Sequence, residues 1–358
     1  MKNKLLLTSA LAGSLIAGSA LAQTSITGDL VVNYRVASFD QSAGLASKRG
    51  FGRESQVNVQ NKGKLSNGMD YAAGFSLEFD GQNSAGSQSS PAVERQTISN
   101  ENLYFDLING NTVITVGVDH MQRVYGGATP QVTDNMDDVS YTGTSTTFLV
   151  GSNSTESAGI GIMQRNVAGF SLGAYYVPVT GDFGGYDTGL ANTPTATPRN
   201  SSYELTAIGA NAFGVKGLSV ALQYNKEEKQ VTTNQGDTKS KWAGIGYNAG
   251  QFALGVDRIT NTKKDAATAA NANEDKTIRY GVTFAAAKDI TIGLNQFKTE
   301  RTNNATGKDG DKEKSTAIQV GYNLGPVSAI ANISRTENIA FANGADAEMI
   351  TLRLATKF

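Results

Sequence analysis

The sequence lacks cysteine altogether and contains a single histidine, His120. Without cysteine the chain can form no disulfide framework, no thiol nucleophile and no metal site of the CxxC type. Any site that needs an imidazole must use His120. We therefore expect neither a metal nor a cofactor.

Long apolar runs are also missing, because no stretch after residue 22 is long enough to form a membrane-spanning helix. The first residues differ. Lys2 and Lys4 precede an apolar, alanine-rich stretch that ends in Ala20-Leu21-Ala22. A basic start, an apolar centre and a small-residue cleavage site are typical of a secretory signal peptide. We expect residues 1–22 to be removed and residues 23–358 to form one mature domain.

A strong charge of either sign is absent too. Removal of Lys2 and Lys4 with the signal peptide leaves 29 basic residues against 32 acidic ones. A nucleic-acid binder would carry a marked positive excess. The sequence therefore predicts no nucleic-acid partner.

What the mature chain does contain is hydrophobicity with a period of two. The clearest hairpin flanks the turn Ser66-Asn67-Gly68 and continues into the apolar face formed by Tyr71, Ala73, Phe75, Leu77 and Phe79. Similar runs recur from Ile26–Val36 to the last one, Ile350–Phe358. Only helices and closed barrels can pair every backbone group in lipid, and amphipathic runs of about ten residues are typical of membrane barrels.

The connections between these runs alternate in length. Short ones lie near 66–68, 108–111, 165–169, 213–217, 248–251, 285–289 and 323–326, and long polar ones near 39–52, 80–96, 119–156, 178–202, 229–240, 259–276, 298–314 and 335–346. Together they join sixteen strands. We therefore predict an all-β, transmembrane antiparallel β-barrel of about 16 strands, with short periplasmic turns and long external loops.

A secreted β-sandwich is the soluble alternative, since its strands also alternate. The polar face of these runs carries many charges and glycines, which suits a water-filled lumen better than a packed core. The apolar face carries aromatic residues near the strand ends, among them Tyr34, Phe79 and Tyr322. Interfacial aromatic girdles of a barrel would place them there.

Three features resemble the sixteen-stranded, trimeric general-diffusion porins of Gram-negative bacteria. The chain ends on Phe358 after an alternating strand, residues 102–117 resemble the strand–turn–strand before the family's third external loop, and the connection that follows, 119–156, is the longest and carries acids. The resemblance implies an outer-membrane porin, a passive diffusion channel for ion transport and for small polar solutes. It also implies a homotrimer, an inward-folded third loop, contact with outer-membrane lipid and lipopolysaccharide, and a terminal Phe358 read by the barrel-assembly machinery.

A barrel of this size needs charges inside its bore to discriminate between solutes. We expect at least one of Asp134, Asp137 and Asp138 in the third loop to line a constriction. The basic wall opposite them would be formed by Arg35, Arg53, Arg279 and Arg353. Arg35, Arg279 and Arg353 face the lumen by parity, whereas Arg53 lies at a loop edge and its side is open. The inward acids and bases roughly balance, so we expect weak ion preference, slightly cationic.

Two other functions remain as alternatives to a channel that is not an enzyme. Gly169-Phe170-Ser171-Leu172-Gly173 matches the G-x-S-x-G pattern of hydrolases, although Ser171 lies within an alternating run and would have to use His120. A surface adhesin or structural barrel with a plugged lumen is the second alternative.

Asp309-Gly310-Asp311 could accept Ca²⁺, but the calcium-loop pattern is incomplete.

Overall fold

The structure, a computed structural model, describes residues 22–40, 48–80, 98–118, 158–178, 201–228, 237–263, 273–303, 308–309 and 312–358. Most of these residues lie in strands. The strands are β1 (Gln23–Phe39), β2 (Lys48–Lys64), β3 (Asp70–Asp80), β4 (Ile98–Asn109), β5 (Thr112–Val118), β6 (Ala158–Val167), β7 (Phe170–Val177), β8 (Ser201–Ala210), β9 (Leu218–Glu228), β10 (Thr238–Asn248), β11 (Phe252–Lys263), β12 (Asn273–Ala287), β13 (Ile290–Asn303), β14 (Lys308–Asp309), β15 (Glu313–Asn323), β16 (Val327–Glu337) and β17 (Ala347–Lys357). No helix among the described residues is long and apolar enough to cross a membrane.

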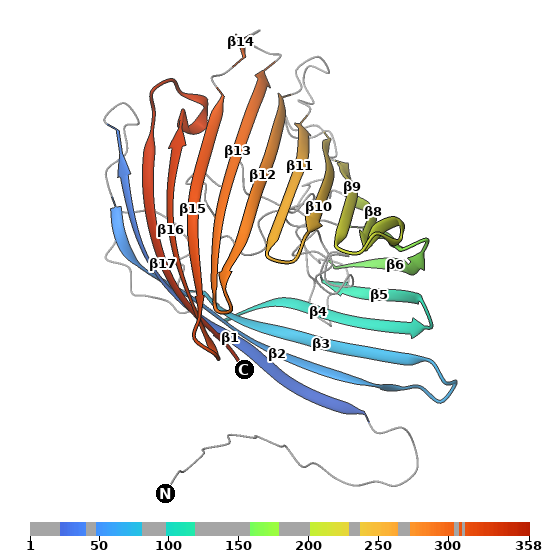
Figure 1. Ribbon diagram of the computed structural model, residues 1–358. Helices are drawn as coiled ribbons and strands as arrows, with labels where there is room; N and C mark the ends of the chain where they lie inside the picture. The colour runs from blue at the N-terminus through green and yellow to red at the C-terminus, as the bar shows by residue number, and fades with distance from the viewer. Residues whose placement is uncertain are drawn as a thin grey trace, which may run out of the picture.

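The strands close into a ring because the first strand pairs with the last. β1 pairs antiparallel with β2 on one side and with β17 on the other. β14 has two residues and pairs only with the end of β13, so β13 and β15 are direct neighbours in the wall. Within the described residues, sixteen antiparallel strands form the closed barrel (Figure 1). This result confirms the predicted fold class.

Two faces of opposite character alternate along each strand, as the period of two predicted. In β11, Leu254 and Val256 on the outer face are 54% and 43% exposed, whereas Asp257 beside them is 2% exposed on the inner face. The same pattern holds in β17, where Leu352 and Leu354 point outward and Thr351 inward. The outer face would meet lipid, because an apolar band facing outward and polar residues facing inward define a membrane barrel.

Tight turns join the strands at one end of the barrel, and asparagine side chains stabilise them. Asn67, Asn248 and Asn323 each accept a hydrogen bond from the backbone N–H two residues later, at 3.1, 3.0 and 3.0 Å. In such Asx turns the asparagine side chain replaces a backbone carbonyl as the hydrogen-bond acceptor, and this stabilises the reversal of the chain. Gly250, which follows Asn248 in its turn, has a φ of 83°, a conformation that glycine adopts without strain.

Both ends of the described chain lie at this short-turn end. The N–H of Gly28 donates to the carbonyl of Phe358 at 2.9 Å, and the N–H of Phe358 donates to the carbonyl of Gly28 at 3.0 Å. The last residue is therefore part of the seam that closes the barrel. Short turns at the end that carries the termini and long connections at the other are the arrangement of bacterial barrels.

Two connections share one compact form built on asparagine. They contain the 3-10 helices η3 (Ala212–Gly214) and η4 (Ile339–Phe341). In each, a left-handed asparagine precedes the helix and its side chain accepts the N–H six residues later: Gly217 to Asn211 at 2.8 Å, and Gly344 to Asn338 at 3.1 Å. The second connection falls in the predicted polar loop 335–346, yet its Ile339 is buried.

Candidate pore

Two arginines predicted for the pore wall lie on the inner face beside the β1–β17 seam. Arg353 lies between Leu352 and Leu354, which are 51% and 54% exposed on the outer face, so Arg353 points into the barrel. Asn33 of β1 pairs with Arg353, and Arg35 pairs with Thr351. Arg35 and Arg353 are therefore diagonal neighbours, close enough for their positive charges to act on one region of the bore.

Open space adjoins this pair of arginines. Gly50 of β2 lies opposite Arg35, and a Cβ built on Gly50 would meet no atom within 4 Å. Arg353 lines a cavity of about 680 Å³ that reaches the short-turn end, where Lys288, Asp289 and Lys357 also line it. Lys288 lies in the turn between β12 and β13, and no strand alternation could have predicted its place. The charged residues that line this cavity are therefore mainly basic.

The inner face across the barrel, on β8 to β13, is polar but buried. Its members with less than 8% exposure are Ser202, Glu204, Thr206, Asn225, Glu227, Ser240, Asp257, Thr277, Arg279, Asn295 and Thr299. Charges there are shielded from bulk water. A shielded charge acts less on a passing solute than one that faces open space.

Arg279 faces inward as predicted, but it belongs to this buried wall. Its Nε donates to Asp257 Oδ1 at 2.6 Å, and its second nitrogen donates to the other oxygen of the same carboxylate. Both side chains are 0% exposed, and the guanidinium lies 6.0 Å from the ring centroid of Phe297. The carboxylate of Asp257 neutralises the positive charge of Arg279 through this bidentate pair. Arg279 is therefore a structural residue and not part of the accessible basic wall.

Arg53 lies on the other side of the barrel wall from the lumen. The register of β1 and β2 sets Arg53 opposite Val32 and Phe51 opposite Tyr34. Val32 is 51% exposed on the outer face, and directly paired residues share a face. This register corrects the expectation that Arg53 could line the pore.

An apolar cluster on the inner face was not predicted. It joins Val113, Met163, Tyr175, Val177, Ile208, Ala221, Trp242 and Ile259, all buried, across β5 to β11. Tyr175 donates its hydroxyl hydrogen to the carbonyl of Gly117 at 2.7 Å. The sequence held a signal for Trp242, because Ala243, Ile245 and Tyr247 form the outer face and the residue before them must point inward.

The remaining predicted residues either lie outside the described chain or occupy ordinary strand positions. Asp134, Asp137, Asp138 and the proposed inward fold of the 119–156 loop lie outside the described residues, as does His120. Ser171 lies inside β7 opposite Ile208, and not at the strand-to-helix turn that a hydrolase nucleophile requires. Among the described residues, no group of three or more acidic or histidine side chains could hold a metal ion.

A closed barrel with an apolar outside and an accessible polar wall inside belongs to the class of outer-membrane channels. A family model described as "Gram-negative porin" matches residues 7–350, and the chain belongs to this family. It is a porin, a channel for passive diffusion across the outer membrane. No curated protein sequence matches the chain.

Solved structures support the fold. The anion-selective porin from Comamonas acidovorans has a TM-score of 0.66 at 13% identity, covering 94% of this chain and 100% of that one. OmpF of Salmonella typhi, in complex with daunomycin, has a TM-score of 0.65 at 10% identity, covering 94% of this chain and 97% of that one. The outer-membrane channel DcaP of Acinetobacter baumannii has a TM-score of 0.64 at 10% identity, covering 94% and 97%.

Proposed function

We propose that the mature chain, residues 23–358, forms a water-filled pore whose conduction is tuned by a basic wall of Arg35 and Arg353. The observation that supports this proposal is the position of these two side chains. They lie on the inner face of adjacent strands, beside the open space at Gly50 and the cavity that Arg353 lines. Small hydrophilic solutes and ions would cross by diffusion down their gradients, and apolar ones would be penalised.

The acidic side of the pore would come from the long connection after β5. Asp134, Asp137 and Asp138 would face Arg35 and Arg353 across the bore. Charges of opposite sign on facing walls would create a transverse field that orients polar solutes. Arg279 would add little to that field, because its carboxylate partner neutralises it.

The proposal also includes the route to the membrane and the partners there. Residues 1–22 would act as a signal peptide for export, and Phe358 would be read by the barrel-assembly machinery. The folded barrel would contact outer-membrane lipid and lipopolysaccharide and form a homotrimer. The position of Phe358 in the closing seam supports its role in assembly, since an error there would leave two strand edges unpaired.

A planar-bilayer recording of the purified mature chain tests the pore. We expect large stepwise conductance increases on addition of protein, with each step proportional to the salt concentration. An absence of steps from protein that migrates as a folded barrel would contradict the proposal and favour a plugged adhesin or structural barrel.

We further propose that the barrel has no catalytic activity. Ser171 within β7 is the one nucleophile that the sequence motif offers, and its strand position argues against activation. The variant Ser171→Ala should conduct like the wild type, and neither protein should hydrolyse ester or phospholipid substrates. Hydrolysis by the wild type that Ser171→Ala abolishes would show that the barrel-wall hydrolase is the better description.

A further inference from the structure

Three basic side chains interrupt the apolar outer face on neighbouring strands β10 and β11. Along β10, Ile245 and Tyr247 point outward, and Lys241 and Lys239 continue the same face toward the long connections. Along β11, Leu254 and Val256 are followed on that face by Arg258. Both Lys241 and Arg258 are exposed. These cations lie where the apolar band ends on the side of the long connections.

Other outward-facing cations of the neighbouring strands have carboxylate partners. Lys276 Nζ lies 2.6 Å from Glu274, Lys298 lies 3.7 Å from Glu300, and Lys314 lies 3.9 Å from Glu337. Within the part of the chain that the structure describes, Lys239, Lys241 and Arg258 form no ion pair within 4 Å, and only Arg258 has a carboxylate at longer range, that of Glu274. A lipid-facing charge without a counter-ion is costly, so an anion from outside the chain would stabilise this position.

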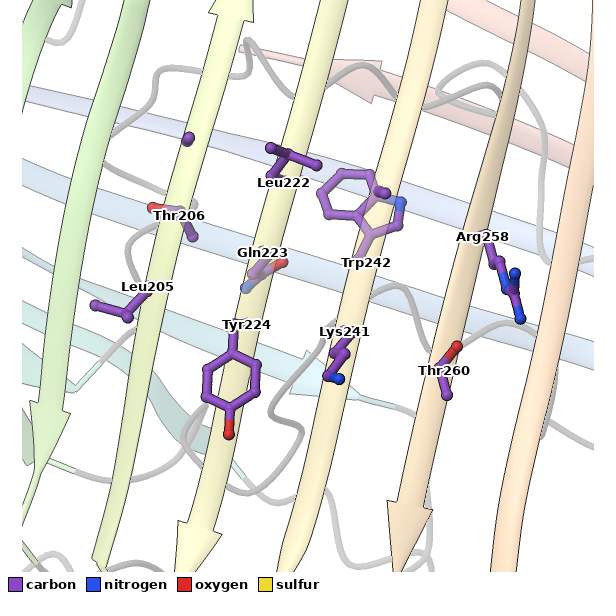
Figure 2. Close-up of a pocket in the computed structure, with 11 residues that line it drawn as sticks. Leu205, Thr206, Leu222, Gln223, Tyr224, Lys241, Trp242, Arg258 and Thr260 are labelled. Carbon is purple, nitrogen blue, oxygen red and sulfur yellow. The ribbon is translucent and has the colours of Figure 1, made fainter.

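The cations border a shallow groove, which we call the β10 groove, lined in part by Leu205, Leu222, Tyr224, Lys241, Ala243 and Arg258. Its volume is about 490 Å³. Lys241 pairs with Thr260, and Arg258 pairs with Ala243, so the two charges lie diagonally on adjacent strands. Figure 2 shows Lys241 and Arg258 beside Thr260, with Leu222 and Tyr224 on the next strand. The groove thus combines a cationic edge with an apolar floor.

We propose that the β10 groove binds the phosphate headgroup of an anionic membrane lipid, with Lys241 and Arg258 as its ligands. Arginine matches a phosphate in bidentate geometry and lysine adds a point charge, while the leucines would pack against an acyl chain. Charge complementarity and the position at the end of the apolar band favour a lipid over a soluble anion. This inference rests on the proposed placement of the barrel in the outer membrane and gives its lipid contact a defined site.

The sole tryptophan of the chain provides a local readout. Trp242 points inward and is buried, so the double change W242F/A243W moves the tryptophan to outward-facing Ala243 in the β10 groove, where its fluorescence reports lipid at this one position. The W242F/A243W barrel, in which the double variants below are also made, is reconstituted in vesicles of brominated phosphatidylcholine, which quenches the introduced tryptophan, and increasing fractions of non-brominated phosphatidic acid are added. We expect phosphatidic acid to relieve quenching with a binding constant on the order of tenfold above that of phosphatidylcholine at low salt, since each nearby cation adds attraction.

A matched pair of double variants isolates the site. K241Q/R258Q should bind phosphatidic acid and phosphatidylcholine about equally. K276Q/K298Q removes the same amount of charge from two lysines that form ion pairs with glutamates, and it should keep the preference for phosphatidic acid. No preference in the wild type, or equal loss in both double variants, would overturn the proposal. Inorganic phosphate that abolishes the preference at the same concentration as the lipid would identify an ion site instead, and also overturn it.

Two further readouts separate this inference from others. A change in oligomeric state of K241Q/R258Q on native gels would show that the surface contacts a second copy, which would refute the lipid site. The stepwise conductance of K241Q/R258Q should equal that of the wild type. A wild type that prefers phosphatidic acid but does not conduct would refute the pore and leave the lipid site standing.

Discussion

The four arginines predicted for the pore wall differ in role because their neighbouring residues differ. Arg35 and Arg353 face accessible space, Arg279 is held by Asp257 with 0% exposure, and Arg53 shares the outer face with Val32. A guanidinium stays charged in all these places. What changes is whether that charge reaches a permeating ion, a buried carboxylate or the membrane.

The first residue-scale prediction concerns ion selectivity. Arg353→Glu replaces a positive charge with a negative one in the lumen, so cation preference should rise. The reversal potential in a tenfold salt gradient measures this change. Arg53→Glu makes the same charge change on the outer face and should leave the reversal potential near the wild-type value; equal shifts in the two variants would contradict the assigned faces.

A second residue-scale prediction concerns the buried ion pair. Asp257→Asn leaves the guanidinium of Arg279 buried without its counter-charge and should lower the free energy of unfolding by about 3–5 kcal/mol. Denaturant unfolding in detergent measures it. Asp70→Asn, which removes the exposed Lys64–Asp70 pair, should cost less than about 1 kcal/mol. Similar costs for both variants would mean that the Asp257–Arg279 pair is not buried in solution.

Parity along a strand predicted the inward direction of Arg35, Arg279 and Arg353, because hydrophobic neighbours on both sides fix the face. It could not show that Asp257 holds Arg279, since cross-strand register depends on the turns. The side of Arg53 stayed open because the outer face of β2 has Ser55 and Arg53 between Phe51 and Val57, so the apolar alternation is interrupted there.

At the scale of elements, the strands and their turns were the most predictable feature. Runs such as Tyr71–Phe79 and Ile350–Phe358 lie in β3 and at the end of the chain as expected, because alternation and turn residues are local signals. The loop 335–346 was expected to be merely polar. It folds around Ile339 and Ala345, a packing that no short-range pattern reveals.

The element-scale prediction tests the closing seam between β1, β2 and β17. A Cβ on Gly28 would lie 2.4 Å from the carbonyl oxygen of Gln56 and 2.6 Å from the ring of Phe358. Gly28→Val should therefore reduce the yield of folded barrel and lower stability by about 1–3 kcal/mol. Heat-modifiable migration on gels reports the folded fraction. Gly50→Val, where the added Cβ meets open space, serves as the control, and a comparable loss there would count against the seam.

At the scale of the whole molecule, closure of the barrel explains both the strand pairing and the two faces of each strand. Sixteen strands in the described residues leave no unpaired edge, and the only surface left for the apolar face is the outside of the ring (Figure 1). The sequence predicted the strand count because fifteen connections of alternating length require it. It could not predict which part of the inner wall stays accessible, because that depends on how distant segments pack.

Cysteine accessibility tests the central claim, that water lies inside the ring and lipid outside. Because the chain contains no cysteine, each introduced thiol is the single site that a thiol reagent can modify. Single substitutions Arg35→Cys, Arg353→Cys, Leu352→Cys and Leu354→Cys are reconstituted in bilayers and treated with a charged, water-soluble thiol reagent. The arginine positions should react and their conductance should fall, while the two leucine positions should remain unmodified. Equal reaction at Leu352, Arg353 and Leu354 would contradict a barrel with an aqueous interior and a lipid-facing exterior.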